Sequence, residues 1–127
     1  MSFVGQEGDA GREPATALSS EERALAFVRR FAAGDVDGLA SLLAENVRVV
    51  GPHLDVASRA DYLAALRADP PQPAAARVLS VTGDGDTVAV FWEYEKPERA
   101  VTVAQLFRLR GARIAEMHIV FDTGTPA

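Results

Sequence analysis

The sequence contains no cysteine among its 127 residues. It therefore forms no disulfide and carries no thiolate nucleophile. Two histidines and no cysteine provide no zinc set, because His53 with Asp55 gives at most two ligands where three or four are needed. We therefore expect neither a metal nor another cofactor. Because a cysteine-free chain suits a reducing compartment, we also expect a cytoplasmic protein.

Basic residues are scarce relative to acidic ones. Thirteen lysines and arginines stand against 18 aspartates and glutamates, which gives a net charge of -5. Such a balance offers no basic surface for nucleic acid or for anionic lipid. The sequence also lacks an apolar run near the roughly 20 residues that span a membrane, and its N-terminal segment does not resemble a secretion signal. We expect a soluble protein with neither nucleic acid nor membrane as partner.

Hydrophobic residues make up 48% of the chain, enough for one domain with a sizeable core. Residues 1–18 contain few large apolar side chains, so their burial cannot offset the entropy lost on ordering. The composition therefore predicts a flexible N-terminal tail over 1–18 and a single domain over 19–127.

Three segments combine a capping residue with apolar side chains at helical spacing. Ser19 and Glu22 form a capping box before the first helix, which ends at Gly34. Asp35 caps a second, shorter helix, and Ser58 begins a third. The apolar faces of the three helices are Leu25, Val28 and Phe31; Leu39, Leu42 and Leu43; and Tyr62, Leu63 and Leu66.

The second half of the sequence changes to a period of two, which is typical of strands. Together with a short strand that ends at Gly51-Pro52, the predicted strands cover 47–50, 77–81, 87–94, 100–110 and 113–121. Helices followed by an antiparallel meander indicate an α+β fold.

Both faces of the last three strands are largely apolar. The residues concerned are Trp92, Met117 and Phe121 on one face and Phe91, Leu106 and Val120 on the other. One face packs under the helices, and the other needs a second cover, which a partner subunit usually supplies. We predict a homodimer through the sheet. Strict alternation also places Ile114 and His118 on the outer face.

Two stretches, FVRRFAAGDVDGLASLLAENVRVVGP and FRLRGARIAEMHIVFD, resemble SnoaL-like and ketosteroid isomerase-like members of the nuclear transport factor 2-like superfamily. The resemblance covers about residues 22–122. It implies a cystatin-like α+β fold, in which three N-terminal helices wrap a cone-shaped, curved antiparallel sheet around a deep apolar pocket. Such proteins include isomerases, cyclases, epoxide hydrolases, dehydratases and non-catalytic binders, so the fold leaves the reaction open.

The polar residues that ketosteroid isomerases use are absent. The resemblance places their tyrosine at Phe27, their general base at Gly51 and their protonated aspartate at Gln105. An amide donates a hydrogen bond but does not transfer a proton. The sequence therefore argues against steroid isomerisation.

SnoaL-type cyclases resemble this chain more closely at the end of the last strand. Their acid/base aspartate matches Asp122, whereas their assisting histidine falls at Gln105. Burial at the mouth of an apolar pocket would make Asp122 a usable acid or base, but it can equally be an ordinary carboxylate at a strand end. Met117 and Ile119 stand where relatives often place polar groups, which predicts a drier pocket wall.

The stretch VVGPHLD places His53 and Asp55 just beyond a Gly-Pro corner. Either side chain could reach over the pocket mouth, where histidine titrates in a useful range; the alternative is a solvated loop. The candidate catalytic residues are thus Asp122, His53 and Asp55. The candidate ligand-binding residues are Phe27, Phe31, Trp92, Tyr94, Gln105, Met117, Ile119 and Phe121, although aromatic residues at period two are also typical of plain core.

Two functions follow from these residues. The first is a pocket protein for a small hydrophobic cyclic molecule, including a cyclase- or isomerase-type enzyme of secondary metabolism that uses Asp122. The second is a non-catalytic ligand binder or a dimeric interaction module. The retained Asp122 favours the first and the replaced isomerase residues favour the second, so the sequence leaves open whether the protein is an enzyme. Epoxide hydrolysis would need a second inward carboxylate, which the sequence does not place.

Overall fold

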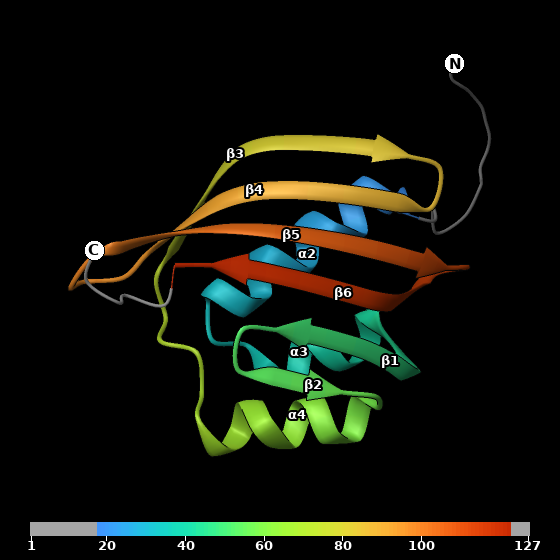
Figure 1. The fold of residues 1–127 in the computed structure, drawn as a ribbon, viewed down its shortest axis with the longest axis horizontal. Coiled ribbons are helices and arrows are strands. Elements are labelled where there is room, and N and C mark those ends of the chain that lie inside the picture. The colour runs from blue at the N-terminus through green and yellow to red at the C-terminus, as the bar shows by residue number, and fades with distance from the viewer. Residues whose placement is uncertain (1–17, 123–127) are drawn as a thin grey trace.

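Six strands form one sheet in the order β2-β1-β6-β5-β4-β3, and the helices pack against it (Figure 1). The computed structural model describes residues 18–122, so nearly all of the predicted tail over 1–18 lies outside the described residues. The elements are α2 (Ser20–Ala32), α3 (Val36–Leu39), the 3-10 helix η1 (Ala40–Leu42), β1 (Leu43–Gly51), β2 (Leu54–Val56), α4 (Arg59–Ala68), β3 (Ala75–Asp84), β4 (Thr87–Glu95), β5 (Ala100–Arg110) and β6 (Arg113–Phe121).

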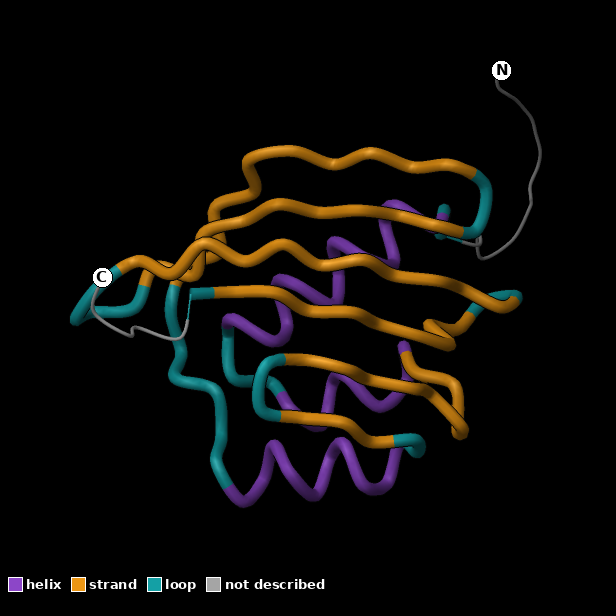
Figure 2. Tube along the Cα trace, viewed as in Figure 1, coloured by secondary structure: helices purple, strands orange, loops and turns teal. Residues whose placement is uncertain are grey.

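The sheet is curved and does not close into a barrel, as the family resemblance implies. The β1–β2, β3–β4, β4–β5 and β5–β6 pairs are antiparallel as expected. The β1–β6 pair is parallel instead, so the sheet is mixed and not purely antiparallel. Helix α2 packs against β3, β4 and β6, and α4 packs against β1 (Figure 2).

The helix starts follow the predicted side-chain caps. The main-chain N–H of Ser19 donates to Glu22 Oε1 at 2.8 Å, and the N–H of Glu22 donates to Ser19 Oγ at 3.1 Å. Asp35 accepts from the N–H of Gly38 at 2.9 Å, and Ser58 accepts from that of Asp61 at 3.1 Å. Each cap satisfies a donor that the first turn of a helix leaves without a partner, which confirms the capping predictions.

The second helix is shorter than its apolar pattern predicts. Helix α3 spans four residues and passes through η1 directly into β1 at Leu43, four residues before the predicted strand start. Leu43 is fully buried and pairs with Ile114 of β6. Leu39, Leu42 and Leu43 fit a helical face, but pairing within the sheet decides the conformation of Leu43.

A bulge in β6 corrects the predicted faces of that strand. The register of β5 and β6 shifts between Arg108 and Leu109, so Ile114 is buried rather than on the outer face. Met117, three residues later, is also fully buried, which strict alternation does not permit. His118 remains on the outer face as predicted, and its Nε2 lies 2.6 Å from Glu116 Oε2.

The core lies between the inner face of the sheet and the helices. Three of its large aromatic side chains come from α2, α4 and β5: the ring of Phe27 lies 6.4 Å from Tyr62 and 5.7 Å from Phe107. All three are no more than 1% exposed. Within residues 18–122, no helix is long and apolar enough to cross a membrane.

Candidate functional site

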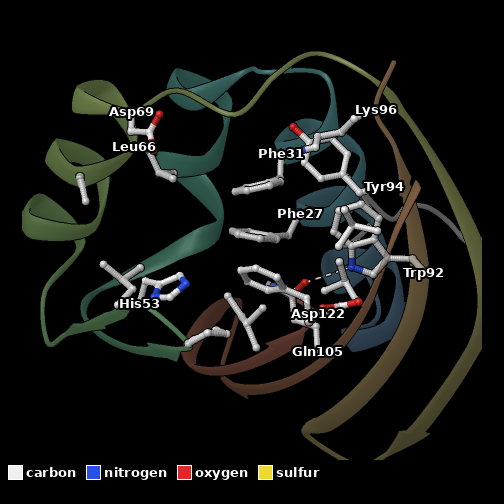
Figure 3. Close-up of a pocket in the computed structure, with 18 of the residues that line it drawn as sticks. Phe27, Phe31, His53, Leu66, Asp69, Trp92, Tyr94, Lys96, Gln105 and Asp122 are labelled. Atoms are coloured by element: carbon white, nitrogen blue, oxygen red, sulfur yellow. Dashed lines mark hydrogen bonds between the residues drawn. The ribbon is translucent and has the colours of Figure 1, made fainter. Parts of the chain in front are cut away.

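A cavity of about 570 Å³ opens between the inner face of the sheet and helices α2 and α4 (Figure 3). Strands β4, β5 and β6 form one wall, the two helices form the opposite wall, and the Gly51–Leu54 turn lies at the rim. This volume is within the range of pockets that hold small organic molecules.

Aromatic rings from two elements form the main wall of the cavity. Phe27 and Phe31 of α2 lie nearly parallel, with centroids 6.1 Å apart (Figure 3). The ring of Phe31 meets those of Trp92 and Tyr94 edge to face, at 6.4 Å and 5.9 Å. Such rings offer flat apolar surfaces with fixed orientation, which suit a planar or cyclic ligand.

Gln105 of β5 carries the one buried side-chain amide within the described residues, at 4% exposed, and no charged side chain there is buried. Trp92 Nε1 donates to its Oε1 at 3.1 Å, and its Nε2 donates to the sulfur of Met117 at 3.4 Å. The contact with Trp92 fixes the orientation of the amide, because indole N–H only donates. Nε2 carries two hydrogens and makes one hydrogen bond within residues 18–122, so one N–H remains for a ligand.

Charged and polar side chains gather at the mouth. They are His53, Asp69, Lys96, Arg99 and Asp122. Asp122 lies at the end of β6 and is exposed, not buried as its proposed role would suggest. Arg99 Nη2 donates to the main-chain carbonyl of Asp122 at 3.2 Å, and Lys96 Nζ lies 5.6 Å from the centre of the Tyr94 ring. The cavity therefore has an apolar interior and a charged rim.

The cavity brings together most of the residues selected from the sequence. Those on its lining are Phe27, Phe31, His53, Trp92, Tyr94, Gln105, Ile119, Phe121 and Asp122. Met117 lies outside the lining, where it contacts the Gln105 amide from behind. Asp55 also lies outside it, and its carboxylate forms an ion pair with Arg48 at 2.9 Å. The geometry thus gives neither Met117 nor Asp55 a direct contact with a bound molecule.

Sequence reasoning missed the contribution of α4 to the cavity. Tyr62, Ala65 and Leu66 all line it, although the helical pattern indicated only that Tyr62 and Leu66 face the core. Tyr62 is 1% exposed, and burial raises the pKa of its hydroxyl, so the phenol is neutral near pH 7. Its hydroxyl makes no hydrogen bond to another residue of 18–122.

Within residues 18–122, no three carboxylate or imidazole groups are placed to hold one ion. The side chains at this site offer apolar surface, hydrogen-bond donors on Gln105 and Tyr62, and a carboxylate and an imidazole at the mouth, those of Asp122 and His53.

A family model described as the SnoaL-like domain matches residues 24–117, most of the chain. The chain belongs to this SnoaL-like family. Among curated proteins, the comparison finds no match. The SnoaL-like assignment agrees with the curved sheet and with the cavity at its inner face.

Solved structures share the fold of this SnoaL-like protein. A nuclear transport factor 2-like protein of unknown function from Cytophaga hutchinsonii matches with a TM-score of 0.71 and 17% identity, over 84% of this chain and 93% of that one. A putative ketosteroid isomerase from Kribbella flavida gives 0.72 and 18%, over 85% and 81%. An epoxide hydrolase of the LEH-like type from M. tuberculosis gives 0.65 and 14%, over 81% and 82%. At these identities the likeness shows the fold alone.

Proposed function

We propose that this SnoaL-like protein binds a small, mostly apolar cyclic molecule in its cavity. The observation that supports this most directly is the composition of the wall: aromatic rings surround one buried amide, Gln105, which retains a free N–H donor. Apolar rings would pack on Phe27, Phe31 and Trp92, and a carbonyl or hydroxyl of the molecule would accept from Gln105.

A thermal-stability screen tests this function without a known ligand, because a bound molecule stabilises the folded state by mass action. The panel contains terpenoids, steroids and aromatic polyketides. Two variants of one helix provide the control: Ala65→Phe fills the cavity, whereas Ala64→Phe adds the same ring on the exposed side of α4. A hit that stabilises wild type and Ala64→Phe but not Ala65→Phe supports the proposal. Equal stabilisation of all three contradicts it.

A second candidate function is proton transfer on the bound molecule, as in a cyclase or isomerase of secondary metabolism. Asp122 favours it, because this carboxylate lies at the cavity mouth, with His53 on the same rim. Asp122 would act as acid or base and His53 would assist it. Steroid isomerisation is not proposed, since Phe27 and Gly51 have no polar side chain.

The enzyme hypothesis is tested on a compound identified in the stability screen. Asp122→Asn should lower its turnover by roughly 10²- to 10⁴-fold and leave its affinity unchanged. Asp69→Asn, which changes another carboxylate of the mouth, serves as the matched control. Equal turnover by wild type and Asp122→Asn would remove Asp122 from the reaction. No turnover by either protein would support the non-catalytic binder.

We also propose that a second copy of the chain covers the outer face of the sheet. Three large apolar side chains are exposed there or beside it: Leu79 at 45%, Phe91 at 51% and Val120 at 66%. Exposed apolar surface of this kind is typical of an interface, and a symmetric dimer pairs the same surface from both subunits. The proposed partner is thus the protein itself.

A further inference from the structure

Tyr62 has a buried hydroxyl group that the packing of the core does not explain. Its ring stacks on that of Phe27 at 6.4 Å and its side chain is 1% exposed, yet its oxygen bonds to no other residue of 18–122. Buried polar groups in folded proteins nearly always have a hydrogen-bond partner. A phenylalanine would occupy the same space without leaving such a group unsatisfied.

The second tyrosine of the wall shows the ordinary arrangement. The hydroxyl of Tyr94 donates to the main-chain carbonyl of Gln72 and is therefore satisfied within the protein. Tyr62 differs because its neighbours are apolar: Phe27 stacks on it, and Leu66 follows one turn later on the same helix. Since Tyr62 lines the cavity, a molecule in the cavity can supply the partner that the protein does not.

We propose that the Tyr62 hydroxyl donates a hydrogen bond to a carbonyl or ether oxygen of the bound molecule. This inference rests on the proposed function and specifies the class of ligand: an apolar ring system that carries an acceptor oxygen. Gln105, on the sheet side of the same cavity, also offers a donor after its oxygen has bonded Trp92. Two donors in an otherwise apolar wall discriminate strongly against a plain hydrocarbon, because the hydrocarbon leaves both without a partner.

The test compares two probes that differ in one oxygen, 1-tetralone and its parent hydrocarbon tetralin. Dissociation constants are measured for wild type, Tyr62→Phe and Tyr94→Phe. Wild type should bind the ketone more tightly than the hydrocarbon. Tyr62→Phe should weaken ketone binding by roughly three- to tenfold and leave tetralin within about twofold. Tyr94→Phe should preserve the preference for the ketone, because the Tyr94 hydroxyl bonds to Gln72.

Three outcomes would overturn the inference. If Tyr62→Phe binds the ketone as tightly as wild type does, the proposed hydrogen bond does not exist. The proposed function still stands in that case, because all variants bind the probes. If neither probe binds any variant, the proposed function fails for this class of compound and the inference fails with it. A clear loss of stability in ligand-free Tyr62→Phe would assign the hydroxyl a partner in the folded protein instead of in the ligand.

Discussion

The two tyrosines of the cavity wall have the same chemical group in different surroundings. Burial raises the pKa of Tyr62, and burial is also the largest cause that raises the pKa of Tyr94. Tyr94 is only half-buried, however, whereas Tyr62 is 1% exposed. Of the two tyrosines, Tyr62 is therefore the one whose ionisation destabilises the folded state more.

This difference predicts a pH dependence of stability in alkaline solution. Because burial raises the pKa of Tyr62 in the folded state, the neutral phenol contributes to the free energy of unfolding. This contribution is fully present below the unfolded-state pKa of 10.0 and is lost as pH rises above it. The free energy of unfolding of wild type, measured in urea, should thus decline above about pH 10. The decline should be smaller in Tyr62→Phe. Tyr94→Phe is the control and should reduce it less. Identical declines in wild type and Tyr62→Phe would contradict the account.

At the scale of elements, short-range signals predicted most of the secondary structure. The Ser19 and Glu22 pair marked the start of α2 correctly, because a cap depends on residues three positions apart. The predictions that Leu43 lies in a helix and that Ile114 lies on the outer face were wrong. Pairing with β6, about 70 positions away, decides the conformation of Leu43, and the bulge in β6 decides the face of Ile114. Both errors concern the sheet, where contacts distant in sequence override local periodicity.

Helix α4 allows a direct test of a cap that supports the cavity. Ser58→Ala removes the acceptor for the N–H of Asp61 and should lower the free energy of unfolding by about 1 kcal/mol, measured by urea denaturation. Ser80→Ala, on an exposed position of β3, should change it by less than about 0.5 kcal/mol. A loss for Ser58→Ala no greater than that of the control would show that the cap contributes little.

At the scale of the whole molecule, the sequence predicted the kind of cavity better than its details. The aromatic side chains of α2 and β4 were identified because their spacing points them inward. Tyr62 was assigned to the core alone, since a helical pattern cannot show which buried residues border an unfilled volume. The sequence left open whether Asp122 is buried or is an ordinary carboxylate at a strand end, because its exposure depends on where β6 ends relative to the rim of the cavity.

The outer face of the sheet predicts self-association. Val120→Lys and Phe91→Lys place a charge on the exposed apolar surface, where burial against a second copy would be costly. Sedimentation equilibrium should show a wild-type dimer that either substitution converts toward monomer. Ala64→Lys, on the exposed side of α4, should leave the dimer intact. A wild type that is monomeric throughout the accessible concentration range would refute the proposed interface.

The central claim is that a small cyclic molecule occupies the cavity, and Trp92 reports on it directly. Trp92 is the only tryptophan of the chain; its ring lies on the cavity wall and its N–H bonds Gln105. The decisive measurement is a fluorescence titration of wild type, Ala64→Phe and Ala65→Phe with a compound that stabilises the protein. We predict a saturable change in emission for the first two and at least tenfold weaker binding by Ala65→Phe. A compound that stabilises all three proteins but changes the Trp92 emission of none would lie outside the cavity, and it would contradict the account.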